Sequence, residues 1–529
     1  MAQITIENLS FSYPKAKNAA ISKVSLKIGQ GTFVVLCGKS GCGKSTLLRN
    51  IKPAICPFGK KEGQVFWNGE KIEAVDEKLQ ARKIGFVMQS PEHQLVTDKV
   101  WHELAFGMEN LGYPQHEIQM RVAEISEYFG ITDWYEQKVD LLSGGQKQLL
   151  NLAATMVLNP EILILDEPTA QLDPIAAEHF LDTLKKINED FGITIILSEH
   201  RLNYVLPMAD QAIIMEQGQV IHQGAVSEVL MKNLDNEFMK LMPYPAQIYY
   251  EATKDGKGPM PISVRQGREW MEAGKRAGVV EEASLEETKQ SVVSCKNVWF
   301  RYEREGRDIL RGLTTQINGG EIFAILGGNG TGKTTTLSVL SGLYRPYRGK
   351  IQITGNVTYL PQDVQTLFCR DTVEKELEGV PEELVKFMEL QEYLKHHPYD
   401  LSGGQQQKLG LAKVLATDPD ILLLDEPTKG IDGIYKEQLG KILVELKQQG
   451  KTIIIVSHDI DFCGEYADRC GLFSRGNIVS AGPVRSFFAG NRFYTTTVNK
   501  MAGKVLKGAV KKEDVLCFLT EDNTISSPL

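Results

Sequence analysis

The stretch that decides the fold begins Thr32-Phe-Val-Val-Leu-Cys37 and continues Gly38-Lys-Ser-Gly-Cys-Gly-Lys-Ser-Thr46. Its first part is a short apolar run rich in strand-forming residues. Its second part fits G-x-x-x-x-G-K-[ST], after which Leu47, Leu48 and Ile51 recur at helical spacing. A strand, a glycine loop and a helix in this order are the context that identifies a phosphate-binding P-loop. The glycines let backbone N–H groups surround the phosphates, and the positive end of the helix dipole adds to the attraction.

The chain repeats this motif once, and four shorter motifs repeat with it. The second P-loop is Gly327-Gly-Asn-Gly-Thr-Gly-Lys-Thr-Thr335, and it follows an apolar run at residues 322–326. The other repeated pairs are Phe11-Ser-Tyr13 with Phe300-Arg-Tyr302, Leu142-Ser-Gly-Gly-Gln146 with Leu401-Ser-Gly-Gly-Gln405, Leu165-Asp-Glu-Pro-Thr169 with Leu424-Asp-Glu-Pro-Thr428, and Ser198-Glu-His200 with Val456-Ser-His458. One P-loop match could be a coincidence in a glycine-rich turn, but two at the repeat offset could not. The sequence therefore predicts a divergent duplication whose second copy is shorter between its P-loop and its LSGGQ run.

The repeat divides the chain into four parts. We expect a first domain at residues 1–242, a linker at 243–290, a second domain at 291–498 and a C-terminal tail at 499–529. The linker prediction rests on proline, glycine and acidic residues between the copies. Ser263 could cap one short helix that extends to about Arg276.

Length and composition exclude several classes of protein. The 529 residues are too many for one hydrophobic core, and 42% hydrophobic and 24% charged residues are typical of folded globular protein. A net charge of −8 makes nucleic acid an unexpected partner. The most apolar runs have the length of strands, and none approaches the roughly 20 apolar residues that cross a bilayer. If the protein acts at a membrane, another subunit must span it.

A pair of acidic residues follows a buried strand in each copy. Ile162-Leu-Ile-Leu165 precedes Asp166 and Glu167, and Asp425 and Glu426 repeat the pair. Such a pair could simply be surface acids at the end of a core strand. Together with a P-loop, however, the aspartate is expected to hold the Mg²⁺ shell and the glutamate to polarise the attacking water.

The LSGGQ runs give the most specific signal. Ser143 and Gln146, three residues apart, form a capping box pattern at a helix start, but this explains neither adjacent glycine nor the repetition. Serine and two glycines at a helix N-terminus form a second phosphate-binding surface. The run resembles the signature motif of ABC ATPases, and all five residues match in both copies. This resemblance covers nearly the whole chain except the linker and about the last 30 residues.

The resemblance implies the fold, the ligands and the site. It implies two α/β P-loop NTPase domains arranged head to tail, each a three-layer core with a helical insertion, near Trp101 to Asp140 in the first and Asp371 to Asp400 in the second. It implies ATP and Mg²⁺ as ligands. Gln89 and Gln362 match the Q-loop, His200 and His458 the switch histidine, and Tyr13 and Tyr302 the aromatic residue that stacks on adenine. The expected catalytic residues are Glu167, Glu426, His200, His458, Gln89 and Gln362, and the expected metal ligands are Ser45, Gln89, Asp166, Thr334, Gln362 and Asp425. The residues expected to bind nucleotide are Tyr13, Gly38, Lys39, Ser40, Gly41, Cys42, Gly43, Lys44, Ser45, Thr46, Ser143, Gly144, Gly145, Gln146, Tyr302, Gly327, Gly328, Asn329, Gly330, Thr331, Gly332, Lys333, Thr334, Thr335, Ser402, Gly403, Gly404 and Gln405.

Within this family the chain most resembles fused ATPase subunits of energy-coupling factor importers, which take up vitamins and transition-metal ions. Gln89-Ser-Pro-Glu-His-Gln-Leu-Val96 resembles their Q-loop extension, and Phe493-Tyr-Thr-Thr-Thr-Val-Asn499 resembles a tail of fused members. The second copy departs from this pattern, because Gln362-Asp-Val-Gln-Thr-Leu lacks the Pro-Glu pair. The resemblance implies a peripheral protein on the cytoplasmic face of the cell membrane. Its implied partners are an integral transmembrane subunit and a substrate-binding membrane subunit.

Two alternative functions come from other classes. A soluble tandem ABC protein that acts on ribosomes usually carries a long, strongly charged helical linker and basic extensions. Here the linker is short and acidic, and residues 504–512 form only a modest basic cluster. A nucleotide-binding regulator that hydrolyses little would not need both glutamates and both histidines.

Overall fold

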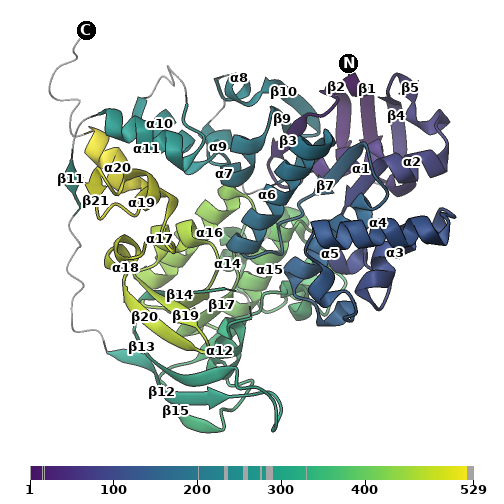
Figure 1. Ribbon diagram of the computed structural model, residues 1–529. Coiled ribbons are helices and arrows are strands. Elements are labelled where there is room, and N and C mark those ends of the chain that lie inside the picture. The colour runs from purple at the N-terminus through teal and green to yellow at the C-terminus, as the bar shows by residue number, and fades with distance from the viewer. Residues whose placement is uncertain are drawn as a thin grey trace. The chain divides into compact units, whose positions relative to one another are not determined.

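The computed structural model divides into two compact units, residues 1–242 and 243–529 (Figure 1). It describes residues 2–14, 16, 18–199, 202–231, 236–253, 260–274, 277–280, 290–328, 330–429 and 431–520. His200 and Asn329, both expected at nucleotide sites, lie outside the described residues, as does the end of the expected tail from residue 521.

The first unit contains two sheets. The central sheet has the strand order β10-β9-β3-β8-β7-β6, with β10 antiparallel to β9 and all other neighbours parallel. Its strands are β3 (Phe33–Gly38), β6 (Ile84–Val87), β7 (Ile162–Asp166), β8 (Thr194–Ser198), β9 (Gln211–Glu216) and β10 (Gln219–Ala225). The antiparallel sheet has the order β2-β1-β4-β5, formed by β1 (Ala2–Ser12), β2 (Ile21–Gly29), β4 (Lys60–Trp67) and β5 (Glu70–Lys71). Side chains from both sheets and from helix α1 (Lys44–Ile51) share one hydrophobic core.

The helices of the first unit include the expected insertion. Helices α3 (Val100–Asn110) and α4 (Gln115–Tyr128) pack against each other and against α5 (Gly144–Met156), which starts at the LSGGQ run. The remaining helices are α2 (Glu77–Lys83), α6 (Pro174–Phe191), α7 (Leu202–Val205), α8 (Val226–Met231) and α9 (Asn236–Met239).

The second unit repeats this architecture. Its central sheet has the order β16-β17-β18-β14-β19-β20 and its antiparallel sheet the order β13-β12-β15. The strands are β12 (Ser291–Phe300), β13 (Leu310–Asn318), β14 (Ile322–Leu326), β15 (Arg348–Ile353), β16 (Val357–Leu360), β17 (Ile421–Asp425), β18 (Thr452–Val456), β19 (Arg469–Ser474) and β20 (Asn477–Pro483). The helices are α12 (Lys333–Leu340), α13 (Val373–Glu376), α14 (Glu382–Phe387), α15 (Gly403–Leu415), α16 (Gly433–Gln448), α17 (Ile460–Tyr466) and α18 (Val484–Gly490). The insertion is reduced to α13 and α14, and β16 follows β15 without described counterparts of β5 and α2, so both differences shorten the second copy.

Central strand β14 shows why these runs are apolar throughout. Ile322 and Leu326 belong to a core shared with the helices, whereas Phe323 and Ile325 belong to a core shared with the antiparallel sheet. Successive side chains of a strand point to opposite faces, so a strand between two layers needs apolar residues at every position. Three layers follow, as expected from the resemblance.

The segment between the copies differs from the expected linker. It forms α10 (Tyr244–Thr253), α11 (Val264–Ala273) and β11 (Gly278–Val279), with Ser263 and Gln266 closing a capping box at the start of α11. Helices α10 and α11 share a hydrophobic core with α19 (Thr497–Ala502), β21 (Leu506–Lys507) and α20 (Lys512–Thr520), and Val280, next to β11, packs against this core. We call these six elements the C-terminal cluster. The described residues of the expected linker and tail are therefore parts of one small folded body within the second unit.

Two further contacts hold the C-terminal cluster together. Gly278 and Val279 pair in parallel with Leu506 and Lys507. The Arg268 guanidinium donates to the Lys500 carbonyl at 2.8 Å. Composition suggested a linker because the segment is polar, but a few apolar side chains from distant parts of the chain are enough to order it.

Candidate ATP-binding sites

Each P-loop ends at a glycine that starts a helix. Gly43 precedes α1 with φ 102°, and a Cβ there would lie 2.4 Å from the Ala20 carbonyl oxygen. Gly332 precedes α12 with φ 111°. Only glycine adopts this left-handed backbone in such a confined place without strain. The following N–H groups then point into the loop, where phosphate can bind.

The P-loop lysines are held in place by their own loops. Lys44 Nζ donates to the Gly38 and Lys39 carbonyls at 2.9 and 3.0 Å. Lys333 Nζ makes the same two bonds, at 2.9 Å each, to Gly327 and Gly328. Both lysines are 5% exposed, so each ammonium lies inside the loop that the sequence predicts to surround phosphate.

A hydroxyl from each P-loop contacts the aspartate at the end of a central strand. Ser45 Oγ donates to Asp166 Oδ1 at 2.8 Å, and Thr334 Oγ1 donates to Asp425 Oδ1 at 3.2 Å. Burial raises the pKa of both aspartates above its ordinary value, and the hydroxyl bonds oppose the shift. A hydroxyl and a carboxylate are oxygen ligands of the kind that Mg²⁺ prefers, so this donor set fits the ion.

The glutamates after these aspartates have an unusual backbone conformation. Glu167 has φ 46° and Glu426 has φ 50°. A left-handed residue with a side chain costs about 1–2 kcal/mol, so surrounding contacts must impose it. The Glu167 N–H donates to the Ser198 carbonyl at 3.0 Å, and the Glu426 N–H donates to the Val456 carbonyl at 2.8 Å. The neighbouring strand thus turns each glutamate out of the sheet just beyond the aspartate.

The two glutamates have different side-chain partners. Gln89 Nε2 donates to Glu167 Oε2 at 2.9 Å. Glu426 instead accepts from the His458 N–H at 3.1 Å, and His458 Nε2 lies 3.1 Å from its other oxygen. Burial raises the pKa of Glu426 to about 7, although the Lys333 ammonium opposes the shift.

The second Q-loop glutamine is placed differently from the first. Gln362 is exposed, and among the described residues it makes no hydrogen bond to Glu426. The structure therefore places Gln89 against Glu167 in the first unit and His458 against Glu426 in the second. His200 lies outside the described residues.

The two tyrosines expected at adenine are fixed to the P-loops. The Tyr13 and Tyr302 hydroxyls lie 3.0 and 2.9 Å from the hydroxyls of Thr46 and Thr335. Tyr13 and Tyr302 are 39% and 55% exposed, so each leaves apolar surface beside its P-loop. An exposed ring anchored at its polar end can stack on a base.

The two signature runs start helices α5 and α15 in the same way. Ser143 and Gln146 form a capping box, and Ser402 and Gln405 form another. The helix-capping interpretation is therefore true locally in both copies. The phosphate-binding interpretation remains compatible with it, because both helix N-termini carry two adjacent glycines.

A buried glutamate behind each Q-loop was missed by sequence reasoning. Glu103 Oε2 accepts from the N–H groups of Val96 and Thr97 at 3.1 and 2.8 Å. Glu376 accepts from two backbone N–H groups at the matching turn and pairs with Lys413. The signal was a glutamate three residues after Val100 and after Val373, visible only once the two copies are aligned.

The first Q-loop extension is also fixed to the signature helix. Lys147 Nζ donates to Glu92 at 3.2 Å, and Gln148 Nε2 donates to the Met88 carbonyl at 3.1 Å. Gln94 adds a bond to the Phe86 carbonyl at 2.9 Å. The extension therefore contacts both the acidic pair, through Gln89, and the signature helix, through Glu92.

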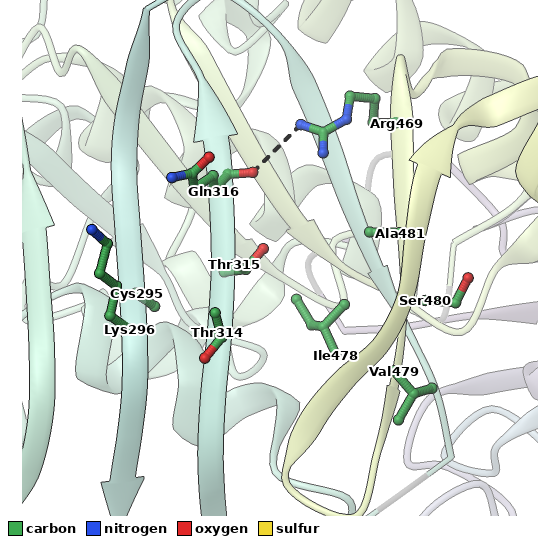
Figure 2. A pocket seen from close by; sticks show the side chains of 10 residues that line it. All are labelled: Cys295, Lys296, Thr314, Thr315, Gln316, Arg469, Ile478, Val479, Ser480 and Ala481. Carbon is green, nitrogen blue, oxygen red and sulfur yellow. Dashed lines mark hydrogen bonds between the residues drawn. The ribbon is translucent and has the colours of Figure 1, made fainter.

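A cavity of about 380 Å³ lies in the second unit, away from these motifs (Figure 2). Its Arg469 side chain already donates to Gln316 and to the Glu321 carboxylate. The lining residues are Cys295, Lys296, Thr314, Thr315, Gln316, Arg469, Ile478, Val479, Ser480 and Ala481, and none belongs to a repeated motif.

A family model described as ABC transporter matches residues 21–170 and 310–429. The chain belongs to the ABC transporter ATPase family. As a tandem ABC ATPase it binds and hydrolyses ATP, and both matched segments contain a P-loop, a signature run and the acidic pair.

Relatives of this ABC ATPase share its tandem length. A putative ABC transporter ATP-binding protein of Bacillus cereus is 40% identical, with 97% of this chain and 98% of that protein covered. One of Methanosarcina acetivorans is 34% identical over 92% of this chain and 87% of that protein. The solved structure of an RNase-L inhibitor is 21% identical, with 92% of both chains covered and a TM-score of 0.60, which supports the fold alone. Among the described residues of this ABC ATPase, no helix has the length and hydropathy of a membrane span.

Proposed function

We propose that this ABC ATPase powers an energy-coupling factor type importer for a vitamin or a metal ion. The observation that supports it most is the first Q-loop extension, which resembles that of such importers. This extension is fixed to Glu167 through Gln89 and to the signature helix through Lys147. Its last residue, Val96, is 63% exposed and offers an apolar contact to a partner.

The proposed partners are an integral transmembrane subunit and a substrate-binding membrane subunit. The protein would lie on the cytoplasmic face of the cell membrane. Opening and closing of the ATPase domains would move the transmembrane subunit through the Q-loop surface. The family's relatives carry names of transporter ATP-binding proteins, which supports a membrane partner in general.

The proposed chemistry assigns a role to each group near the acidic pairs. Ser45, Asp166 and Gln89 would hold Mg²⁺ in the first site, and Thr334, Asp425 and Gln362 would hold it in the second. Bound Mg²⁺ supplies charge neutralisation at the phosphates.

The protein's own groups would bind the phosphates and activate water. Lys44 and Lys333 would contact the β- and γ-phosphates. Glu167 and Glu426 would orient and polarise the attacking water, with the switch histidines at the γ-phosphate. Glu167→Gln combined with Glu426→Gln should keep ATP affinity and stop turnover; near-normal hydrolysis would refute these roles.

We also propose that each site borrows the signature of the other domain in a head-to-tail pair. Lys44→Ala with Ser402→Arg should then damage one site, so the two changes should be non-additive. Lys44→Ala with Ser143→Arg should damage both sites and reduce hydrolysis to background. If this second pair proves non-additive in both ATP binding and turnover, each domain uses its own signature and the proposed arrangement is wrong.

Membrane recruitment tests the importer function. The chain should copurify with an integral subunit and drive uptake in vesicles only when both are present. Val96→Asp should reduce membrane recovery and uptake, while the matched control Val479→Asp, an exposed position in β20, should not. Cosedimentation with ribosomes, with no membrane subunit recovered, would overturn the importer proposal.

A further inference from the structure

The aspartates of the two ATP sites receive their second hydrogen bond from different residues. In the first unit, Asp166 Oδ1 accepts from Ser198 Oγ at 2.9 Å. In the second unit, Asp425 Oδ2 accepts from the Tyr359 hydroxyl at 3.0 Å. Each aspartate also accepts from its P-loop hydroxyl, so each carboxylate is held by two hydroxyl groups.

Strand register shows that these second hydroxyls come from opposite neighbours of the strand that carries the aspartate. Asp166 pairs with Ser198 on β8, and Asp425 pairs with Val456 at the same place on β18. Valine has no hydrogen-bonding side-chain atom. The second site therefore lacks the hydroxyl that the first site takes from this strand.

The missing hydroxyl is replaced from the strand on the other side. Tyr359 on β16 is paired with Leu423, two residues before Asp425, and Phe86 on β6 is paired with Ile164, two residues before Asp166. The two aromatic residues thus occupy corresponding positions, and only the second carries a hydroxyl. On the two strands that flank the aspartate, the first copy has Ser198 and Phe86, and the second has Val456 and Tyr359.

We propose that Tyr359 is a positioning residue of the second ATP site, whose phenol orients the Asp425 carboxylate toward the metal. Because the phenol holds Oδ2, Oδ1 stays directed at Thr334, the other proposed ligand. The proposal rests on the proposed role of Asp425 in holding Mg²⁺. It also makes the sites unequal, since the second aspartate depends on a side chain from the Q-loop strand.

Mn²⁺ binding tests this proposal in the full-length chain. An Asp166→Asn background removes the proposed metal ligand of the first site. Mn²⁺ is titrated in the presence of a non-hydrolysable ATP analogue, and the free ion is measured by electron paramagnetic resonance. Tyr359→Phe should weaken Mn²⁺ binding roughly tenfold, the effect of losing one hydrogen bond to a charged group. Affinity for the analogue in EDTA should not change.

A matched control and a rescue separate positioning from a general structural effect. Tyr347→Phe removes a similar phenol, which donates to Asp308 at 2.9 Å, and should leave Mn²⁺ binding unchanged. Adding Val456→Ser to Tyr359→Phe restores a hydroxyl at the position where the first unit has Ser198, and should recover most of the affinity. Circular dichroism of each variant confirms that it is folded.

The outcomes distinguish this proposal from the proposed metal site itself. Asp425→Asn in the same background should abolish specific Mn²⁺ binding. If it does, and folded Tyr359→Phe still binds Mn²⁺ normally, the positioning role is overturned. If Asp425→Asn has no effect, the proposed metal role of Asp425 fails instead.

Discussion

Helix α17 begins two residues after His458 and is packed tightly against Thr496, the N-cap residue of α19 in the C-terminal cluster. A Cβ placed on Gly464 in this helix would lie 2.3 Å from Thr496 Cγ2. Thr496 cannot easily move away, because it is 1% exposed and its hydroxyl donates to the Val510 carbonyl at 3.0 Å. Gly464→Ala therefore tests whether this packing controls the stability of the helix that follows His458, the proposed switch histidine.

Two opposing effects set the size of the change. Alanine favours a helix over glycine by about 0.5–1 kcal/mol. Extra atoms forced into a well-packed core cost about 1–3 kcal/mol. Overlap with a short, β-branched side chain places this site in the upper part of that range. We expect Gly464→Ala to destabilise α17 and the C-terminal cluster by about 1–2 kcal/mol.

Hydrogen exchange is the appropriate assay, because a chain with two units need not unfold in one step. Peptides from α17 and α19 should exchange faster in Gly464→Ala. Thr496→Ser removes the Cγ2 atom but keeps the capping hydroxyl. The double variant Gly464→Ala/Thr496→Ser should therefore be more stable than the sum of the two single effects predicts, by a coupling free energy of about 1 kcal/mol or more. The matched control is Gly107→Ala in α3, whose new Cβ would lie 3.5 Å from Leu158 and should not accelerate exchange.

Two results would refute this reasoning. In the first, Gly464→Ala slows exchange in α17 by the amount that the higher helix propensity of alanine alone predicts. In the second, the effects of Gly464→Ala and Thr496→Ser on the stability of α17 are additive. In either case the contact with Thr496 would not limit the stability of the helix.

Two further predictions concern the C-terminal cluster. Arg485 donates to both oxygens of Asp514 at 2.6 and 2.7 Å; although burial opposes it, this pairing lowers the pKa of Asp514. The stabilisation is therefore present above the ordinary pKa and is lost as pH falls through the lower folded value. The protection factors of amides in α20, which correct each rate for the slower intrinsic exchange at low pH, should therefore fall in acid. Asp514→Asn should remove that pH dependence; an unchanged profile would contradict it. Co-expressed fragments 1–242 and 243–529 should restore ATPase activity. Fragment 280–529, which lacks α10 and α11, should fold poorly and give less activity with fragment 1–242. Equal activity of fragment 1–242 with 243–529 and with 280–529 would contradict the role of the two helices.

The sequence predicted the P-loops because their chemistry is local. A strand, a few glycines and a helix within about 20 residues are enough to form a phosphate-binding loop. The same holds for the capping boxes at Ser143 and Ser402, where each bond joins residues three positions apart. The repeat then predicted two domains of one family, and the family match confirmed it.

Other features depended on which strands become neighbours. The sequence did not predict the left-handed backbone of Glu167 and Glu426, because the adjacent strand imposes it. It did not predict that β11 pairs with β21 across more than 200 residues, so the segment before it was expected to be a linker. Polar composition alone does not show which distant apolar residues will cover a helix.

The two ATP sites show this division most clearly. The residue types at the motifs make both aspartates candidates for metal binding from sequence alone. Only the order of the strands places Ser198 on one side of Asp166 and Tyr359 on the other side of Asp425. Motif chemistry is set by neighbours along the chain, whereas the orientation of each carboxylate is set by hydroxyls that tertiary structure brings from separate strands.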